Sequence, residues 1–271
     1  MATAADLTTL AQAKAWLNIT DTSSDALIAT LITAASRFIM TYTNRSSFLP
    51  TASTRYYDGT MTYSILLRDF PVISVSAVTV NGVAVQASST YPTGYGYFLE
   101  PADSEPPGST QRLLFGGCGW WTRGKANIAV TCTTGYQVTA EAQTVPANPY
   151  QITATQPYGA WGADAGVTYA TGAALTKVAT APAQGQYSVS NGVYTFAATD
   201  AGASVLLSYG YIPADLAQAC FELVGEKYRM RDRIGIVSKT LGGQETISYS
   251  QRDMHPTIKI LLQQYMRVVP A

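Results

Sequence analysis

The spacing of apolar and polar positions changes twice along the chain. From residue 9 to 45 apolar residues recur at intervals of three and four, which predicts two helices. From about residue 54 the interval becomes two, as in strands, and helical spacing returns after residue 209. The chain is therefore expected to combine helices from both of its ends with a long β-rich middle.

The two opening helices carry start signals. Thr9 and Gln12 have the spacing of a capping box, and Thr22 and Asp25 repeat it before the second helix. The second helix is expected to bury one continuous apolar stripe. Its members are Leu27, Ile28, Leu31, Ala35, Phe38, Ile39 and Tyr42. Two helices alone cannot cover this stripe, so later helices are required.

The middle of the chain contains recognisable hairpins. Asn81-Gly82 interrupts "VSAVTVNGVAVQ", and Asn191-Gly192 interrupts a second alternating stretch. Asn-Gly favours the positive φ angles of a type I′ turn, so both pairs predict tight β-hairpins. "RLLFGG" and "ANIAVTCTT" predict two further strands.

Residues 138–208 differ in composition from their surroundings. Their charged residues are Glu141, Asp164, Lys177 and Asp200, and short strands follow one another at the spacing of a β-sandwich. "TTGYQV" precedes this segment and "SYGYIP" ends it, so Gly-Tyr stands on both sides. A small β-domain inserted at a loop of a host domain explains this pattern.

The predicted fold class is α+β: a helical bundle built from the N- and C-terminal helices, a β-sheet subdomain and an inserted β-sandwich. Pro213 is expected in the first turn of a returning helix, with Asp215 near its positive end, and Pro256 opens the last helix. The expected domains are 1–53, 54–137, 138–208 and 209–271, with the last completing the bundle begun by the first.

Charge gives little support for a nucleic-acid or membrane-surface protein. Seventeen basic and seventeen acidic residues cancel, and 13% of the residues are charged. No apolar run approaches the roughly 18 residues that span a bilayer, and "MATAADLTTL" has no secretory pattern. The chain is expected to be made in the cytoplasm and to be soluble there, with no membrane partner.

The candidate chemistry is sparse. "GIVSKTLGG" lacks the glycine directly before lysine that a phosphate-binding loop needs. His255 is the single histidine, so no metal ligand set and no cofactor are expected. Asp103 and Glu105 have the residue types of a glycosidase pair, but their prolines indicate a solvated turn. Cys118, Cys132 and Cys220 are interpreted as small buried thiols, with a Cys118–Cys132 bridge as the alternative.

Two features suit contacts with other macromolecules. Arg229, Arg231 and Arg233 alternate at the end of the returning helix, where cations favour the helix dipole or contact a partner. Eighteen tyrosines with Trp120, Trp121 and Trp161 suit a protein interface, and stacking on sugars is the alternative.

The opening "LTTLAQAKAWLNITDTSSDALIATLITAASRFIMTYTNRSSF" resembles the N-terminal helices of the head–tail connector (adaptor) proteins of long-tailed bacteriophages. "RYYDGT…LLRDFPVISVSAVTVNGVAV" and "IPADLAQACFELVGEKYRMRDRIGIVSKTLGG" are similar to the strands and the returning helix of larger members. The segment 138–208 departs from compact members and resembles immunoglobulin-like modules of virion proteins.

This resemblance implies a structural virion protein of the neck, and no enzyme. It implies a ring of twelve copies in the virion, beneath the portal, that extends the DNA channel and docks a neck stopper or tail protein. Double-stranded DNA passes without specific binding.

We expect residues 234–250 to form an extended arm or hairpin that reaches a neighbouring subunit or the portal, and the terminal helix and tail to form a second docking surface. The expected contact residues are Arg229, Arg231, Arg233, Lys239, Tyr249, Met266, Val268 and Val269.

Two alternatives remain open at this point. The first is a binding module in which the sandwich, with the Trp120–Trp121 loop, recognises a glycan or a decoration partner. The second is a virion-associated hydrolase that acts through Asp103 and Glu105.

Overall fold

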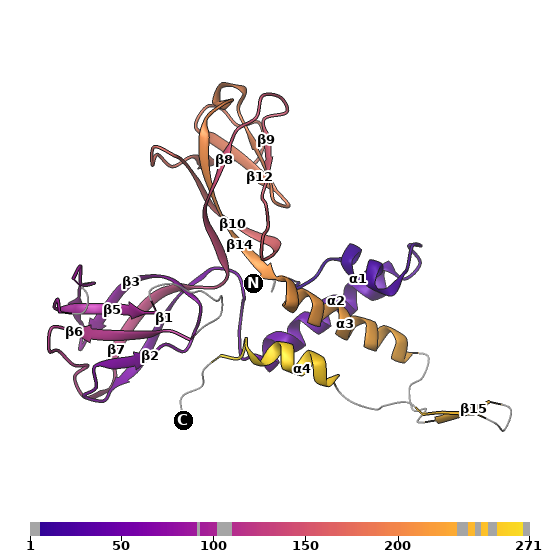
Figure 1. Cartoon of the computed structure of the whole chain (residues 1–271), viewed down its shortest axis with the longest axis horizontal. Coiled ribbons are helices and arrows are strands. Elements are labelled where there is room, and N and C mark those ends of the chain that lie inside the picture. The colour runs from indigo at the N-terminus through magenta and orange to yellow at the C-terminus, as the bar shows by residue number, and fades with distance from the viewer. Residues whose placement is uncertain are drawn as a thin grey trace. The chain divides into compact units, whose positions relative to one another are not determined.

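The computed structural model describes residues 6–90, 93–101, 110–231, 238–241, 245–248 and 254–267; for 238–241 and 245–248 the description is of the backbone. These residues form two compact units (Figure 1). The helical unit comprises Met1–Ser46 and Pro213–Met266, and the β unit comprises Ser47–Ile212 and Arg267–Ala271. The predicted α+β class is confirmed.

The helical unit gathers helices from both ends of the chain. Its elements are α1 (Leu10–Leu17), α2 (Asp25–Tyr42), α3 (Ala214–Met230), α4 (Pro256–Gln263) and a hairpin of β15 (Ser238–Leu241) and β16 (Glu245–Ser248). The helix α3 packs against each of the other three helices. The returning segment therefore supplies the central helix, and the prediction that N- and C-terminal helices form one bundle is confirmed.

The helix starts follow their sequence signals in part. At α1 the capping box of Thr9 and Gln12 forms as predicted. The capping box predicted from Thr22 and Asp25 is wrong, because the N-cap of α2 is Ser24 and its side chain makes no capping hydrogen bond. The Asp25 carboxylate instead accepts from Lys14 Nζ at 2.7 Å, which joins the start of α2 to α1. Pro213 is the N-cap of α3 and not part of its first turn.

The apolar residues of α2 form two stripes where one was predicted. The buried face contains Ile28, Ile32, Ala35, Ser36, Ile39 and Met40. Leu27 and Phe38, which we assigned to the same stripe, are 41% and 43% exposed. The predicted stripe was too wide for one contact, and its outer half faces away from the bundle.

Two polar side chains hold α4 in place. Arg45, which follows α2 and is buried, donates from Nε to the Tyr265 carbonyl at 2.6 Å. Asp215, in the first turn of α3, accepts from the Tyr265 hydroxyl and from Gln264 Nε2. The end of α4 is therefore bonded to both α2 and α3. At its start, the His255 side chain caps the helix by accepting from the Thr257 amide.

The β unit begins with two sheets that share a core. One has the strand order β1-β7-β3-β4 and the other β2-β6-β5. Trp121 is fully buried between them. The Asn81-Gly82 hairpin is confirmed, with φ of 51° and 79°. The strands are β1 (Thr51–Gly59), β2 (Ser64–Leu66), β3 (Val72–Val80), β4 (Val83–Val85), β5 (Gly96–Glu100), β6 (Arg112–Gly116) and β7 (Gly124–Thr134).

The remaining strands form two more sheets around a second core. Their orders are β10-β14-β8 and β11-β12-β13-β9, and the second hairpin turns at Asn191-Gly192 as predicted. Tyr194 and Leu207 are buried at the centre. The elements are β8 (Gln137–Thr144), β9 (Gln151–Thr153), β10 (Gly159–Tyr169), β11 (Thr176–Lys177), β12 (Gln186–Ser190), β13 (Val193–Phe196), a 3₁₀ turn (Ala198–Asp200) and β14 (Ser204–Pro213).

The two Gly-Tyr pairs noted in the sequence meet in space. The strands β8 and β14 are antiparallel partners, with Gln137 opposite Gly210. The Tyr211 amide donates to the Tyr136 carbonyl, and the two rings lie 5.8 Å apart edge to face. The chain thus enters and leaves this part of the β unit side by side, as an insertion requires. The four expected domain boundaries stay a prediction.

All three cysteines are free thiols. Cys132 and Cys220 are buried as predicted, whereas Cys118 is exposed, so its predicted burial is wrong. Cys118 has a φ of 59° in the turn after β6, which directs the chain out of the sheet. The alternative Cys118–Cys132 bridge is not formed, because Cys132 lies inside the first β core.

Replacing Arg45 with Met should lower the free energy of unfolding of the helical unit by about 1–3 kcal/mol, because the buried Tyr265 carbonyl loses a charged donor. Urea denaturation followed by circular dichroism at the helix band measures this change. The control is Arg112→Met, which breaks the exposed pair with Glu100 and should change stability by less than about 0.5 kcal/mol. Equal losses in both variants contradict the role given to Arg45.

Thiol labelling should separate the three cysteines. Burial raises the pKa of Cys220 to about 11 and also raises the pKa of Cys132. Their thiolate forms are therefore rare at pH 8, and the thiols are shielded from reagent. In the folded protein we expect iodoacetamide to modify Cys118 first, with Cys132 and Cys220 reacting after denaturation, as peptide mass mapping reports. Labelling of Cys220 in the native state as fast as Cys118 contradicts this burial.

Candidate interaction surfaces

The predicted arginine cluster lies at the end of α3. Arg229 and Arg231 are exposed, and the Arg231 guanidinium lies 4.3 Å from the centre of the Tyr228 ring. The Tyr228 hydroxyl is 2.9 Å from Ser24 Oγ at the start of α2. Arg231 therefore stacks on a ring that is itself bonded within the bundle. Arg233 lies outside the described residues.

The predicted arm has the backbone of a hairpin. The strands β15 and β16 are antiparallel, with Lys239 opposite Ile247 and Leu241 opposite Glu245. Within the described part of the chain, these two strands form a sheet of their own. A lone two-stranded hairpin is marginally stable in water, so a partner that adds a strand or a packing surface would stabilise it. Tyr249 lies outside the described residues.

The predicted terminal docking surface is described up to Arg267. Met266 is 39% exposed, and Ile260 on the outer side of α4 is 67% exposed. Val268 and Val269 lie outside the described residues. Met266 thus stands where a partner can reach it, beside the bonded end of α4.

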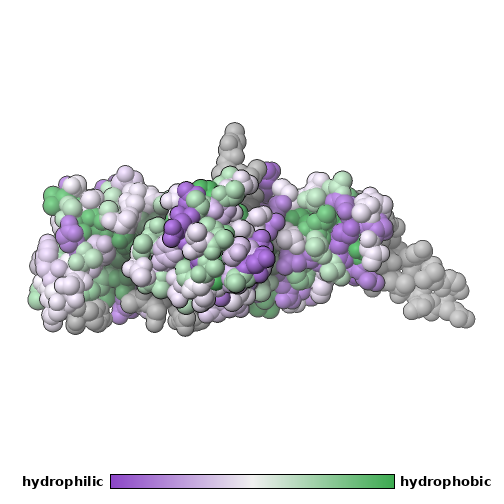
Figure 2. Space-filling model, turned by 90° about the horizontal axis from the view of Figure 1, so that it is seen from above, coloured by the Kyte–Doolittle hydropathy of each residue, from purple (hydrophilic) through white to green (hydrophobic). Residues whose placement is uncertain are grey.

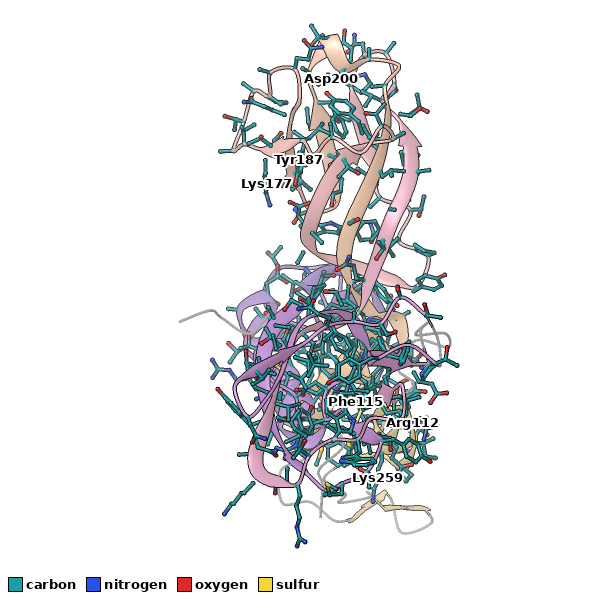
Figure 3. All side chains as sticks on the ribbon, turned by 90° about the vertical axis from the view of Figure 1, so that its left-hand side faces the viewer. Arg112, Phe115, Lys177, Tyr187, Asp200 and Lys259 are labelled. Carbon is teal, nitrogen blue, oxygen red and sulfur yellow. The ribbon has the colours of Figure 1, made fainter. Side chains whose placement is uncertain are left out.

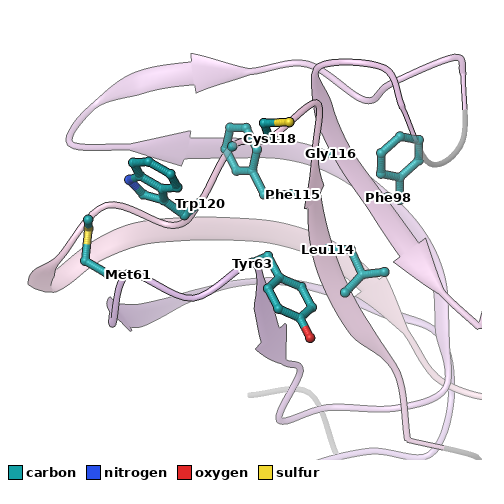
Figure 4. A pocket seen from close by; sticks show the side chains of 9 residues that line it. Met61, Tyr63, Phe98, Leu114, Phe115, Gly116, Cys118 and Trp120 are labelled. Atoms are coloured by element: carbon teal, nitrogen blue, oxygen red, sulfur yellow. The ribbon is translucent and has the colours of Figure 1, made fainter.

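The β unit has an apolar pocket of about 410 Å³ that the sequence did not reveal (Figure 4). Its rim carries exposed large side chains, among them Tyr63 at 68% and Trp120 at 55%. Its floor comes from β5 and β6, and no lining residue is charged. The lining residues are Met61, Tyr63, Phe98, Leu114, Phe115, Gly116, Cys118, Gly119 and Trp120. Such a surface suits contact with another apolar surface.

The three tryptophans proposed to contact sugars or protein partners differ in their exposure to solvent. Trp121 is a core residue, which corrects its assignment as a contact residue. Trp161 is half-buried and donates from Nε1 to the Tyr194 hydroxyl at 3.2 Å. Trp120 alone of the three presents most of its ring to solvent.

The charged side chains of residues 138–208 are hydrogen-bonded or paired within that segment and the strand that ends it. Asp164 accepts from the Tyr187 and Tyr194 hydroxyls and pairs with Lys177 Nζ at 3.1 Å. Lys177 and Tyr187 lie opposite each other on paired strands (Figure 3). Burial, together with Asp164, raises the pKa of both tyrosines, so they remain protonated donors at neutral pH.

The other two carboxylates of this segment are bonded in the same way. Glu141 accepts from the Tyr209 and Thr155 hydroxyls, and Asp200 accepts from the Tyr169 hydroxyl and the Gly185 amide. These contacts use the acceptor capacity of the carboxylates inside the fold. Their arrangement is that of structural networks.

The described residues contain no group of three or more His, Cys, Asp or Glu side chains placed to hold a metal ion. Asp103 and Glu105 lie outside the described residues. Among the helices that are described, none has the length and apolar character to cross a membrane.

The comparisons with known proteins agree with a structural role. No curated protein matches the chain. Residues 6–106, which contain α1, α2 and the strands from β1 to β5, match the family model described as Head completion protein (HCP). This part of the chain is therefore similar to a family of phage structural proteins that act at the head–tail junction.

Proposed function

We propose that this protein is a head–tail connector that assembles as a ring beneath the portal, extends the DNA channel and docks the next neck or tail component. The match of residues 6–106 to head completion proteins carries the proposal. That match ends before α3 and α4, but α2 cannot bury its inner face without α3. The later helices therefore belong to the same structural element as the matched part.

The surfaces described above are those of an assembling protein. Exposed aromatic and aliphatic side chains stand on both units, and Figure 2 shows hydrophobic residues reaching the surface in several places among hydrophilic ones. Large aromatic residues such as Tyr63 and Trp120 are enriched at sites of protein contact. In the proposed connector the copies of the chain, the portal and the neck or tail component cover these surfaces.

The neutral charge of the chain fits a passage for DNA. Seventeen basic and seventeen acidic residues cancel. Many lysine and arginine contacts to phosphate would hold the duplex in place and resist its movement. In our proposal the DNA slides past the ring without being bound specifically.

The location in the virion tests the proposal. Antibody against the protein should label one site per phage particle, at the neck, in negative-stain electron microscopy. Particles from a mutant phage lacking the gene should contain packaged heads without attached tails. Labelling over the whole capsid or along the tail, or normal tail attachment in the mutant, contradicts the connector role.

A deletion tests the arm. Removing residues 236–249, which include β15 and β16, should leave the helix signal and the unfolding midpoint of the purified protein close to wild type, since these strands pair with each other. The same deletion should abolish co-sedimentation with portal-containing heads. The matched control replaces the turn Asn81-Gly82 by Gly-Gly, which retains a permitted hairpin turn elsewhere in the chain. Wild-type binding of the deletion variant would remove the arm from the docking interface.

A further inference from the structure

The outer face of α2 lacks a partner in the described chain. Leu27, Leu31, Ala34, Phe38 and Tyr42 follow one another at intervals of four, three, four and four, which places them on one side of the helix. This outer stripe is about 22 Å long at the α-helical rise. Leu27, Ala34 and Phe38 are exposed, and Leu31 and Tyr42 are half-buried.

The composition of α2 is that of a helix covered on both sides. Its charged residues are Asp25, which is paired with Lys14, and Arg37, which is exposed. A helix with apolar residues on two faces is typically buried on both. The inner face is covered by the bundle, and the outer stripe is available for a second contact.

The polar residues beside the stripe do not oppose its burial. The Thr30 hydroxyl donates to the Ala26 carbonyl at 2.9 Å, and the Thr33 hydroxyl lies 3.3 Å from both the Ala29 carbonyl and Asp6. These hydroxyls are bonded to the chain itself, so covering them does not leave an unsatisfied donor. Arg37 is the one cation of the outer side of α2, and a covering surface must supply an acidic partner for it.

A second surface of the same bundle has the complementary character. Trp16 of α1 is 51% exposed and packs on Phe221 of α3, with ring centres 5.1 Å apart. Its indole also lies over Gly225, where a Cβ would meet Nε1 at 3.2 Å. Glu222 and Glu226 each follow one of these contact positions, about 100° further round α3, and lie one turn apart from each other. Both are half-buried, and Glu222 accepts a hydrogen bond from Gln218 Nε2 at 2.8 Å. We call Trp16, Phe221, Glu222 and Glu226 the aromatic–acidic ridge.

We propose that the outer stripe of α2 docks on the aromatic–acidic ridge of a second copy of this chain, with Arg37 beside Glu222 and Glu226 of the neighbour. The two surfaces come from different helices and have different residues, so the contact is heterologous. Repeated from copy to copy, a heterologous contact closes into a ring when the rotation allows it. The inference deepens the proposed function and rests on it, because it names the faces through which copies join.

A charge exchange tests the pairing in the full-length protein. Phe38→Asp should raise the apparent dissociation constant of self-association at least about tenfold, by placing a charge in an apolar contact. Arg37→Glu and the double variant Glu222→Arg/Glu226→Arg should each weaken association roughly tenfold through like-charge contacts. Combining all three charge changes should restore association to within about threefold of wild type. Sedimentation velocity over a concentration series measures these constants.

Matched controls separate assembly from folding. Val83→Asp introduces a charge at an exposed apolar position of β4 and should leave association unchanged. The helix signal and melting temperature of each variant should stay close to wild type, since Arg37, Phe38 and Val83 are exposed and Glu222 and Glu226 are half-buried. The inference is overturned if wild type stays monomeric, if Phe38→Asp associates like wild type, or if the combined charge exchange fails to restore association. Neck labelling in the virion is measured separately, so the connector proposal survives any of these outcomes.

Discussion

The inner face of α2 is the constraint on which the rest of the structure depends. Its buried residues, including Ile28, Ile32 and Ile39, need a surface that α1 is too short to supply. Burying one such side chain stabilises a fold by about 1.5–3 kcal/mol, so the helical pair gains most of its stability when α3 arrives. The helix α2 ends at Tyr42 and α3 begins at Ala214, so the strands of the β unit lie between them in the sequence. After these strands the chain must return to the helical unit for α3 to pack on α2. The antiparallel pairing of β8 with β14, and the contact of Tyr136 with Tyr211, show how the second half of that path is closed.

The pairing of β8 with β14 also allows residues 138–208 to be an insertion, because it brings the two ends of this segment together. They bury their own core, in which Tyr194 and Leu207 are inaccessible to solvent, and they bond their carboxylates with their own tyrosine hydroxyls. A segment that satisfies its interior and closes at its base makes few demands on its host. The family match ends at residue 106 and does not include this segment. It also makes this segment a weak guide to the function of the remainder.

Local signals in the sequence predicted local structure well. Asn-Gly favours positive φ at two successive residues, and both predicted hairpins form. Thr9 and Gln12 form the predicted capping box, since the two residues lie within one helical turn. Two local predictions failed, since Thr22 and Asp25 form no capping box and Pro213 is the N-cap of α3. The other failures concern which side of an element is covered. Leu27 and Phe38 have the same apolarity as the buried residues of α2, and Trp120 has the same chemistry as Trp121, yet neighbouring positions on a strand or helix face different surroundings. Exposure of Cys118, and the pocket beside Trp120, arise from tertiary contacts that no spacing rule contains.

These failures have a common direction that bears on function. Sequence reasoning placed Leu27 and Phe38 of α2 inside, and the structure leaves both exposed. Trp16 on α1 and Trp120 on the β unit are exposed as well, and Trp120 was predicted to be a contact residue. The ionisable groups behave in the opposite way, since Glu141, Asp164 and Asp200 are bonded by tyrosine hydroxyls and Arg45 by a carbonyl. These carboxylates and Arg45 thus make their hydrogen bonds within the fold, while the apolar side chains named above are exposed. The exposed apolar side chains would be buried by contact with other protein surfaces. Just as α3 covers the inner side of α2, in our proposal a second copy of the chain covers the outer side, which is left exposed by the described residues.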